Sequence, residues 1–305
     1  MDGITLSENT NETASPLLST KPLKIVVRKA KNYVVPLNTP HCYRMRSKPR
    51  GSVLIINNES FTDPGGVYKF RHGSTIDTNS LCDLFSQLGF NTIVRKNRKY
   101  HEMIQDVDNF ANLESHVESD MGILVLLSHG ENRNVISTDG YKLPYDDILT
   151  EFNNEKCPNL CGKPKLFIFP ACRGTKEDYG VRRKICSGPS SGPTESDNFQ
   201  VPNPMKRVPT YGDTLIAYGT VPGYVANRDT TNGTWYIQCL CKVFMKHACD
   251  MEIREMMDAI CRKMGEYESQ FGTIQTCSYE VRGCFNKLYF NPGFNSSSEY
   301  TFKYQ

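Results

Sequence analysis

Short segments that are apolar at nearly every position recur along the chain. Residues 52–57, 121–127 and 165–169 are the clearest of these, and each gives way at once to polar or turn-forming residues. Strands that are apolar throughout, rather than at every second position, are typical of a parallel sheet covered on both faces. The further strand candidates are residues 91–94, 213–218 and 288–290.

Between these segments, apolar residues recur every three or four positions, which is the spacing of one helix face. Leu81, Leu84 and Leu88 form such a face, and Gly89 follows as a residue that commonly ends helices. The other helix candidates are residues 100–113, 144–152, 237–244 and 253–264. Because strands alternate with helices, the pattern predicts an α/β fold with a mainly parallel sheet and helices on both faces.

Two segments lack this order. Residues 1–35 are mixed polar sequence without periodicity, and we expect a mobile leader there. From about residue 186 to residue 209 the chain is rich in Ser, Gly and Pro, which indicates an exposed linker and a preferred site of proteolysis. The ordered core is therefore expected from about residue 50 to the linker, and again from about residue 206.

Composition narrows the class of protein. The chain has 305 residues, of which 38% are hydrophobic and 23% are charged, as in soluble globular proteins. The net charge of +3 is small and no long basic run adds to it, which argues against nucleic acid as a partner. No apolar run reaches membrane-spanning length and the N-terminus lacks a signal-peptide pattern, so we expect a cytoplasmic protein without a membrane partner.

The twelve cysteines do not indicate a metal or disulfide protein. Most of them lie inside apolar segments, where reduced and partly buried thiols are the usual state. Cys157 and Cys161 lack a second ligand pair at zinc-binding spacing, so we expect no metal. No glycine-rich phosphate loop follows the first strand, so a nucleotide cofactor is not expected either.

Candidate chemistry stands at the ends of two predicted strands. His129 follows the segment 121–127, and Cys172 follows the segment 165–169. In parallel α/β folds the functional crevice lies beyond the carboxyl ends of the strands. A thiolate is a strong nucleophile that a neighbouring imidazole can generate, and the backbone N–H groups of Gly130 and Cys172 are candidate donors to an oxyanion. Either residue alone would more often be structural; the pair makes a thiol hydrolase plausible.

Short motifs around these residues resemble those of caspases. The sequence PACRG at 170–174 is similar to the Q-A-C-x-G signature of that family, and LLSHG at 126–130 is similar to the segment with its histidine. RGSVLIIN, GKPKLFIF and GTW follow in the family's order, and the likeness covers about residues 50–292. Residues 43–51 and 247–257 look most similar to nematode cell-death caspases.

The resemblance implies a three-layer fold with a six-stranded sheet. It implies a zymogen that is cut into a large subunit, residues 36–197, and a small subunit, residues 198–305, and a dimer of such pairs. It also implies an endopeptidase without a cofactor that cleaves protein substrates after aspartate and acts in apoptosis. An upstream caspase and an inhibitor protein are the further partners that it suggests.

The resemblance also transfers a substrate site. Arg71 and Arg228 match the two arginines of the family's aspartate pocket, and a guanidinium fork suits a carboxylate well. Without the resemblance they would be ordinary surface arginines. The carbonyl of Lys69 matches the group that orients the histidine. Ser128 and Trp235 are the further positions expected against the substrate.

Two residues depart from the family pattern. Pro170 replaces the usual glutamine and cannot donate a hydrogen bond to the pocket, which favours looser selection that admits glutamate. The alternative is that proline merely stiffens the loop. Asn227 replaces a tryptophan that many members carry, so the preference for residues upstream of the cleaved one is open.

Asp197, in the linker, is the expected processing site, with the small fragment starting at Asn198. An alternative function is a catalytically weak or dead caspase homologue that regulates another caspase by dimerisation. The intact Cys172 and His129 argue against it, and Pro170 argues mildly for it.

Overall fold

A computed structural model describes residues 23–31, 41–180 and 209–294. Its centre is a six-stranded sheet with the strand order β13-β9-β7-β3-β1-β2. All neighbouring strands are parallel except β13, which runs antiparallel to β9. The strands are β1 (Gly51–Asn57), β2 (Asn91–Lys96), β3 (Met121–Leu127), β7 (Lys165–Phe169), β9 (Thr214–Tyr218) and β13 (Ser278–Arg282).

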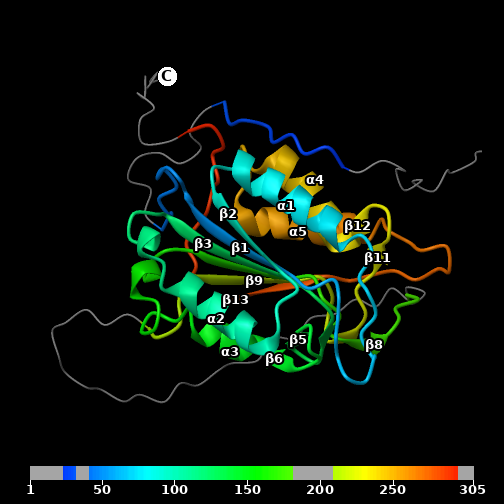
Figure 1. The fold of residues 1–305 in the computed structure, drawn as a ribbon. Coiled ribbons are helices and arrows are strands. Elements are labelled where there is room, and N and C mark those ends of the chain that lie inside the picture. Colours follow the sequence, from blue (N-terminus) through cyan, green and yellow to red (C-terminus); the bar gives the residue numbers. More distant parts are fainter. Residues whose placement is uncertain (1–22, 32–40, 181–208, 295–305) are drawn as a thin grey trace, which may run out of the picture.

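Helices cover both faces of this sheet, so that the molecule has three layers (Figure 1). One face carries α1 (Ser74–Gln87), α4 (Trp235–His247) and α5 (Ile253–Met264). The other carries α2 (Tyr100–Ala111) and α3 (Tyr145–Thr150). The predicted α/β fold with helices on both faces is therefore confirmed.

Short elements link these layers, several of them beyond the carboxyl ends of the parallel strands. They are the 3₁₀ helices η1 (Glu114–His116) and η2 (Pro158–Leu160) and the strands β4 (Gly130–Glu131), β5 (Asn134–Ile136), β6 (Lys142–Pro144), β8 (Gly174–Lys176), β10 (Gly223–Tyr224), β11 (Arg228–Asp229) and β12 (Gly233–Thr234).

The two hydrophobic cores explain why the central strands are apolar throughout. In β1, Val53 and Ile55 pack on the side of α1, α4 and α5, whereas Leu54 and Ile56 pack on the side of α2 and α3. All four are buried, and burial of such a side chain stabilises the fold by about 1.5–3 kcal/mol. A polar residue at any of these positions would lose that contribution on one face or the other.

One predicted strand is wrong. Residues 288–290 form no strand, although Leu288 and Phe290 are fully buried. Their burial comes from packing, since the carbonyl of Leu288 accepts from the N–H of Ile253 at the start of α5 and the Phe290 ring lies against Phe244. The last strand is instead β13, whose mixed polar sequence gave no signal because an edge strand is only half-buried.

Part of the predicted leader is packed. Residues 23–31 run extended beside α1 and α4, and the side chains of Ile25 and Val27 are buried there. The Gln87 side chain donates to the carbonyl of Ile25 at 3.0 Å and accepts from the N–H of Val27 at 2.9 Å, as a neighbouring strand would. These residues extend the packed structure on the N-terminal side of the predicted core.

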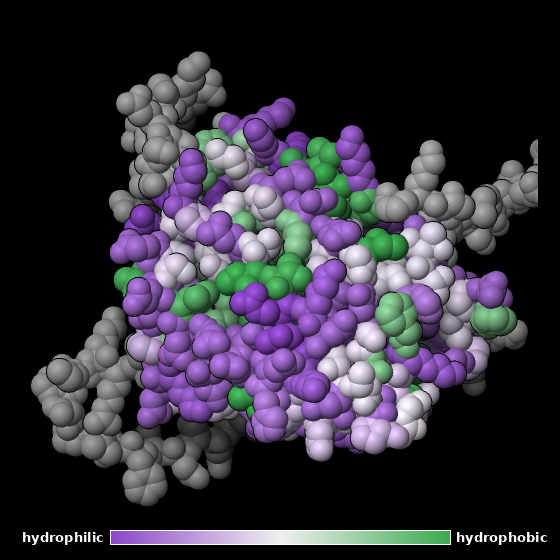
Figure 2. All heavy atoms as spheres, in the orientation of Figure 1, coloured by the Kyte–Doolittle hydropathy of each residue, from purple (hydrophilic) through white to green (hydrophobic). Residues whose placement is uncertain are grey.

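The surface in the view of Figure 2 is mainly hydrophilic, with small separate apolar patches. Within the described residues, no helix combines the length and the apolar character that crossing a bilayer requires. The predicted linker between residues 186 and 209 lies almost wholly outside the described residues.

Candidate active site

The ends of β3 and β7 bring two predicted catalytic segments into contact. These strands are parallel neighbours, so the residues that follow them leave the sheet at the same edge. A Cβ atom on Gly130 would lie 2.6 Å from the carbonyl oxygen of Cys172 and 2.7 Å from the Cβ of Ala171. The backbone after His129 therefore rests directly on the Cys172 segment, at a distance that no side chain at position 130 would allow.

His129 is held by a backbone group and two aromatic rings. Its Nε2 lies 2.8 Å from the carbonyl oxygen of Lys69, which is the contact that the resemblance suggested. A carbonyl can only accept, so Nε2 carries the hydrogen and the neutral ring keeps Nδ1 as its proton acceptor. The rings of Phe61 and Tyr68 lie 4.9 and 5.6 Å from the imidazole, between centroids.

Burial, reinforced by the nearby charges of Arg71 and Arg228, holds the pKa of His129 below its usual value despite the Lys69 contact. The imidazole is therefore neutral near pH 7. A neutral imidazole with an unprotonated Nδ1 is the form that can remove a proton from a thiol.

Cys172 is half-buried, and its sulfur meets the segment that leads to a pocket arginine. The Ala226 N–H donates to the Cys172 Sγ at 3.2 Å. Such a bond stabilises negative charge on sulfur. Because Ala226 stands two residues before Arg228, this bond links the nucleophile to the segment that carries the second predicted arginine.

Arg71 lies immediately before α1 and is only 3% exposed. Its guanidinium donates to the carbonyl of Asn58 at 3.0 Å and to the hydroxyl of Ser74 at 2.7 Å, while Nε has no partner among the described residues. Burial and the neighbouring charge of Arg228 lower its pKa to about 9. Arg71 is thus a cation at neutral pH with an unused donor.

Arg228 lies on β11 and is half-buried, and burial lowers its pKa too. Each of the two guanidinium groups interacts electrostatically with Cys172, and they repel one another. Two like charges in a partly desolvated site favour a ligand that carries a negative charge. The predicted pair is therefore brought together beside the nucleophile, where it suits an anion.

The remaining predicted residues surround this centre in different ways. Ser128 is buried and its hydroxyl donates to the carbonyl of Ile136 at 2.5 Å. Pro170 is buried against the backbone of Gly219, where a Cβ would lie 2.8 Å from the Pro170 carbonyl oxygen. Trp235 is the first residue of α4 and is 4% exposed. The substrate contacts of these residues stay predictions.

Asn227 has an unexpected partner. Its N–H donates to the side-chain oxygen of Gln275 at 2.6 Å, and the Gln275 amide donates to the carbonyl of Gly219, also at 2.6 Å. The Asn227 side-chain nitrogen is buried and without a partner among the described residues. Gln275 thus fastens the segment beside Arg228 to the end of β9, a role for which no local motif gives a signal.

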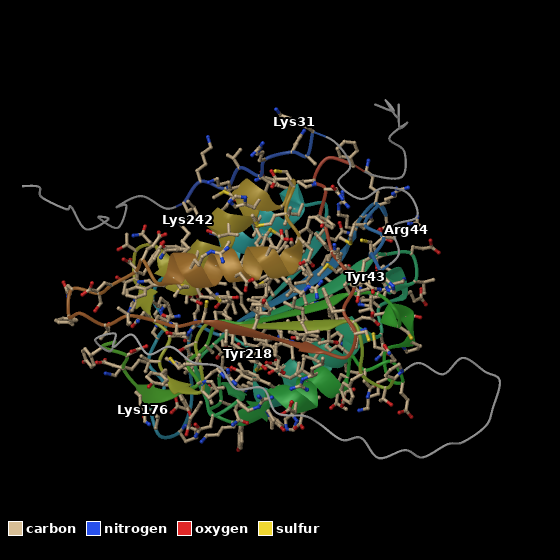
Figure 3. All side chains as sticks on the ribbon, turned by 180° about the vertical axis from the view of Figure 1, so that it is seen from behind. Lys31, Tyr43, Arg44, Lys176, Tyr218 and Lys242 are labelled. Atoms are coloured by element: carbon tan, nitrogen blue, oxygen red, sulfur yellow. The ribbon has the colours of Figure 1, made fainter. Side chains whose placement is uncertain are left out.

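Arg173, next to the nucleophile, packs on the opposite side. Its guanidinium lies 4.0 Å from the centroid of the Tyr218 ring, which belongs to β9 on the α3 side of the sheet (Figure 3). Asp197 lies outside the described residues. Among the residues that the structure does describe, no group of three or more His, Cys, Asp or Glu side chains could hold a metal ion.

Comparison with known proteins gives this geometry a context. A family model for the caspase domain matches residues 50–289. Caspase-2 of Gallus gallus is 33% identical over 259 residues, which are 83% of this chain and 61% of that protein. Cell death protein 3 of Caenorhabditis remanei is 33% identical over 269 residues, 82% of this chain and 52% of that protein.

The chain thus spans between about half and three fifths of these two relatives. The crystal structure of caspase-1 from Spodoptera frugiperda superimposes with a TM-score of 0.72 at 29% sequence identity, and the match covers 89% of this chain and all of that one. The family model covers most of the chain, and the structural likeness agrees with it. The chain belongs to the caspase family.

Proposed function

We propose that the chain is a cysteine endopeptidase that cleaves protein substrates after aspartate. The observation that carries the proposal is the pair of partly or fully buried arginines beside a cysteine and a neutral histidine. When the carboxylate of a substrate aspartate lies between Arg71 and Arg228, the main-chain carbonyl of that aspartate would lie next to Cys172. Family membership supports the same activity.

The reaction follows from the atoms available. His129 takes the Cys172 thiol proton on Nδ1, and the sulfur attacks the substrate carbonyl carbon. The backbone N–H groups of Gly130 and Cys172 stabilise the oxyanion. The intermediate collapses when His129 gives the proton to the departing amine, which leaves a thioester. A water molecule, deprotonated by His129, then releases the acid and restores the thiol.

The neighbouring residues are candidates for further contacts with the substrate. Ser128, Trp235 and the Asn227 side-chain amide, whose nitrogen has no partner among the described residues, are candidates to position the substrate chain upstream. Because Asn227 offers a polar amide where other members carry an apolar ring, we expect an upstream preference for residues that can accept a hydrogen bond. Pro170 offers no donor to the bound carboxylate.

Dimerisation and maturation belong to the same proposal. β13 lies at the edge of the sheet, and within the described residues its outer edge pairs with no other strand. Unpaired backbone groups along an edge favour pairing with another chain, which supports a dimer of large and small subunit pairs. The name of the Caenorhabditis relative supports a role in apoptosis, with the cytoplasm as the expected compartment.

The first prediction concerns activity on matched peptides. The protein should cleave a fluorogenic peptide ending in Asp at least about 100-fold faster, in kcat/KM, than the same peptide ending in Asn. The reason is that charged hydrogen bonds are each worth about 1.5–3 kcal/mol and two arginines take part. Cys172→Ala and His129→Ala should reduce turnover to background, while Cys284→Ala, at an exposed thiol, serves as the control. A processed protein without turnover would favour the regulatory homologue instead.

The second prediction concerns Pro170. The wild type should accept Glu in place of Asp more readily than Pro170→Gln does, because glutamine restores one neutral donor worth about 1 kcal/mol. The ratio of kcat/KM for Asp and Glu peptides should therefore rise roughly fivefold in that variant. Pro170→Ala is the control for loop stiffness, since it relieves the ring without adding a side-chain donor. A wild type that already refuses Glu contradicts the idea.

The third prediction concerns maturation. Mass spectrometry of the purified protein should find a cut after Asp197 that is absent from Cys172→Ala protein and from Asp197→Ala protein. Asp178 and Asp213 are poorer sites because their backbones are hydrogen-bonded to Ile274 and Cys284 in ordered structure. Normal maturation of Asp197→Ala would show that the processing site lies elsewhere.

A further inference from the structure

Asp77 is a buried carboxylic acid that the proposed mechanism does not use. It stands in the first turn of α1, about six residues after Arg71 in the chain, and is 1% exposed. We propose that Asp77 is a positioning residue that fixes Arg71 and Arg228 relative to each other and so sets the affinity for an acidic substrate residue. This inference rests on the proposed aspartate specificity.

The contacts of Asp77 reach directly to the strand partner of Arg228. The Thr234 N–H donates to both carboxylate oxygens, at 2.9 and 3.1 Å, and the Thr234 hydroxyl donates to Oδ2. In the β11–β12 pair, Thr234 stands opposite Arg228. One carboxylate therefore joins the helix that follows the first arginine to the hairpin that carries the second.

The backbone packs so closely around this carboxylate that a side chain at either neighbouring glycine would clash. Gly233 has φ of +89°, and a Cβ there would lie 2.2 Å from the Asp77 Oδ1. At the other end of the contact, a Cβ on Gly73 would lie 2.6 Å from the carbonyl oxygen of Asp229. The start of α1 and the β11–β12 hairpin thus touch through two glycines, and Asp77 supplies their polar link.

Besides its hydrogen bonds, Asp77 contributes a negative charge that acts on the two pocket arginines. Its negative charge acts on both arginines and raises the pKa of each, against the lowering by burial. Asp77 offsets one of the two positive charges, and Glu59 acts on Arg71 with a smaller effect. A substrate aspartate supplies the matching negative charge, so Asp77 holds the empty pocket together while leaving it selective for one more acid.

The carboxylate is retained at a cost in stability. Burial raises the pKa of Asp77 from 3.8 to about 6, although Thr234 and both arginines favour its charged form. The other titratable group that faces it is Cys241 on α4, whose pKa rises further for this reason. Since the folded state binds the proton more tightly than the unfolded chain, stability falls as pH rises from about 4 to about 6 and stays lower above that.

The test compares three variants with the wild type. Asp77→Ala removes the three hydrogen bonds from Thr234 and the charge, Asp77→Asn keeps the shape and loses the charge, and Thr234→Val removes the hydroxyl but keeps the N–H. KM and kcat are measured with the Asp peptide, and the alkylation rate of Cys172 by iodoacetamide, a neutral probe, reports the nucleophile separately. Thermal unfolding is followed between pH 4 and pH 8.

We expect Asp77→Ala to raise KM about tenfold or more, because bonds to a buried charge are lost. Its kcat should change less than about threefold, and Cys172 alkylation should be unchanged, since Asp77 contacts neither reacting atom. Thr234→Val should raise KM by less, about two- to fivefold. Asp77→Asn removes the titrating group, so its melting temperature relative to that of the wild type should rise between pH 4 and pH 6. If folding left the pKa of Asp77 unchanged, the difference would stay constant.

The outcomes separate the two proposals. If the wild type cleaves the Asp peptide but KM is unchanged in Asp77→Ala and Thr234→Val, the positioning role is wrong and the proposed function stands. If kcat and Cys172 alkylation fall while KM stays constant, Asp77 serves general folding and the inference fails. Should Asp77→Ala not fold, the KM of Thr234→Val decides. If the wild type cleaves no Asp peptide, both proposals fail.

Discussion

Two parallel strands, β3 and β7, are hydrogen-bonded side by side and end at the same edge of the sheet. Everything in the candidate site depends on this pairing, because it places His129 and Cys172, remote in sequence, in neighbouring loops. The backbone contact at Gly130 shows how closely the loops meet. The two cores on either face of the sheet hold the strand ends in place, and with them the neighbouring loops that carry the thiol and the imidazole.

The positive charges of Arg71 and Arg228 determine which kind of ligand the site favours. Arg71 and Arg228 are held in a partly dry environment at a cost that Asp77 and the local hydrogen bonds only partly offset. An incoming carboxylate relieves this imbalance, whereas a neutral side chain does not. The same positive charges, together with burial, keep His129 neutral and ready to accept a proton. In the proposed enzyme, substrate selection and activation of the nucleophile would therefore depend on one cluster of charges.

Much of this architecture could be predicted where the signal was local. Strands that are buried on both faces have unbroken apolar sequences. The predicted bounds of the strands before His129 and Cys172 therefore agree with the observed ones. β13 was missed because an edge strand has no such run, and residues 288–290 were mistaken for one because packing alone buries Leu288 and Phe290. Asp77 and Gln275 were missed for another reason: their partners lie far away in the chain.

The most direct test of the central claim is a crystal structure of the protein with a peptide aldehyde that ends in aspartate. An aldehyde adds reversibly to a catalytic thiol, so the complex reports the nucleophile and the pocket together. The account predicts a bond from the aldehyde carbon to the Cys172 sulfur, with the aspartate carboxylate hydrogen-bonded to both Arg71 and Arg228. A bond to Cys172 with the carboxylate directed into solvent, or no bond at Cys172, would contradict it.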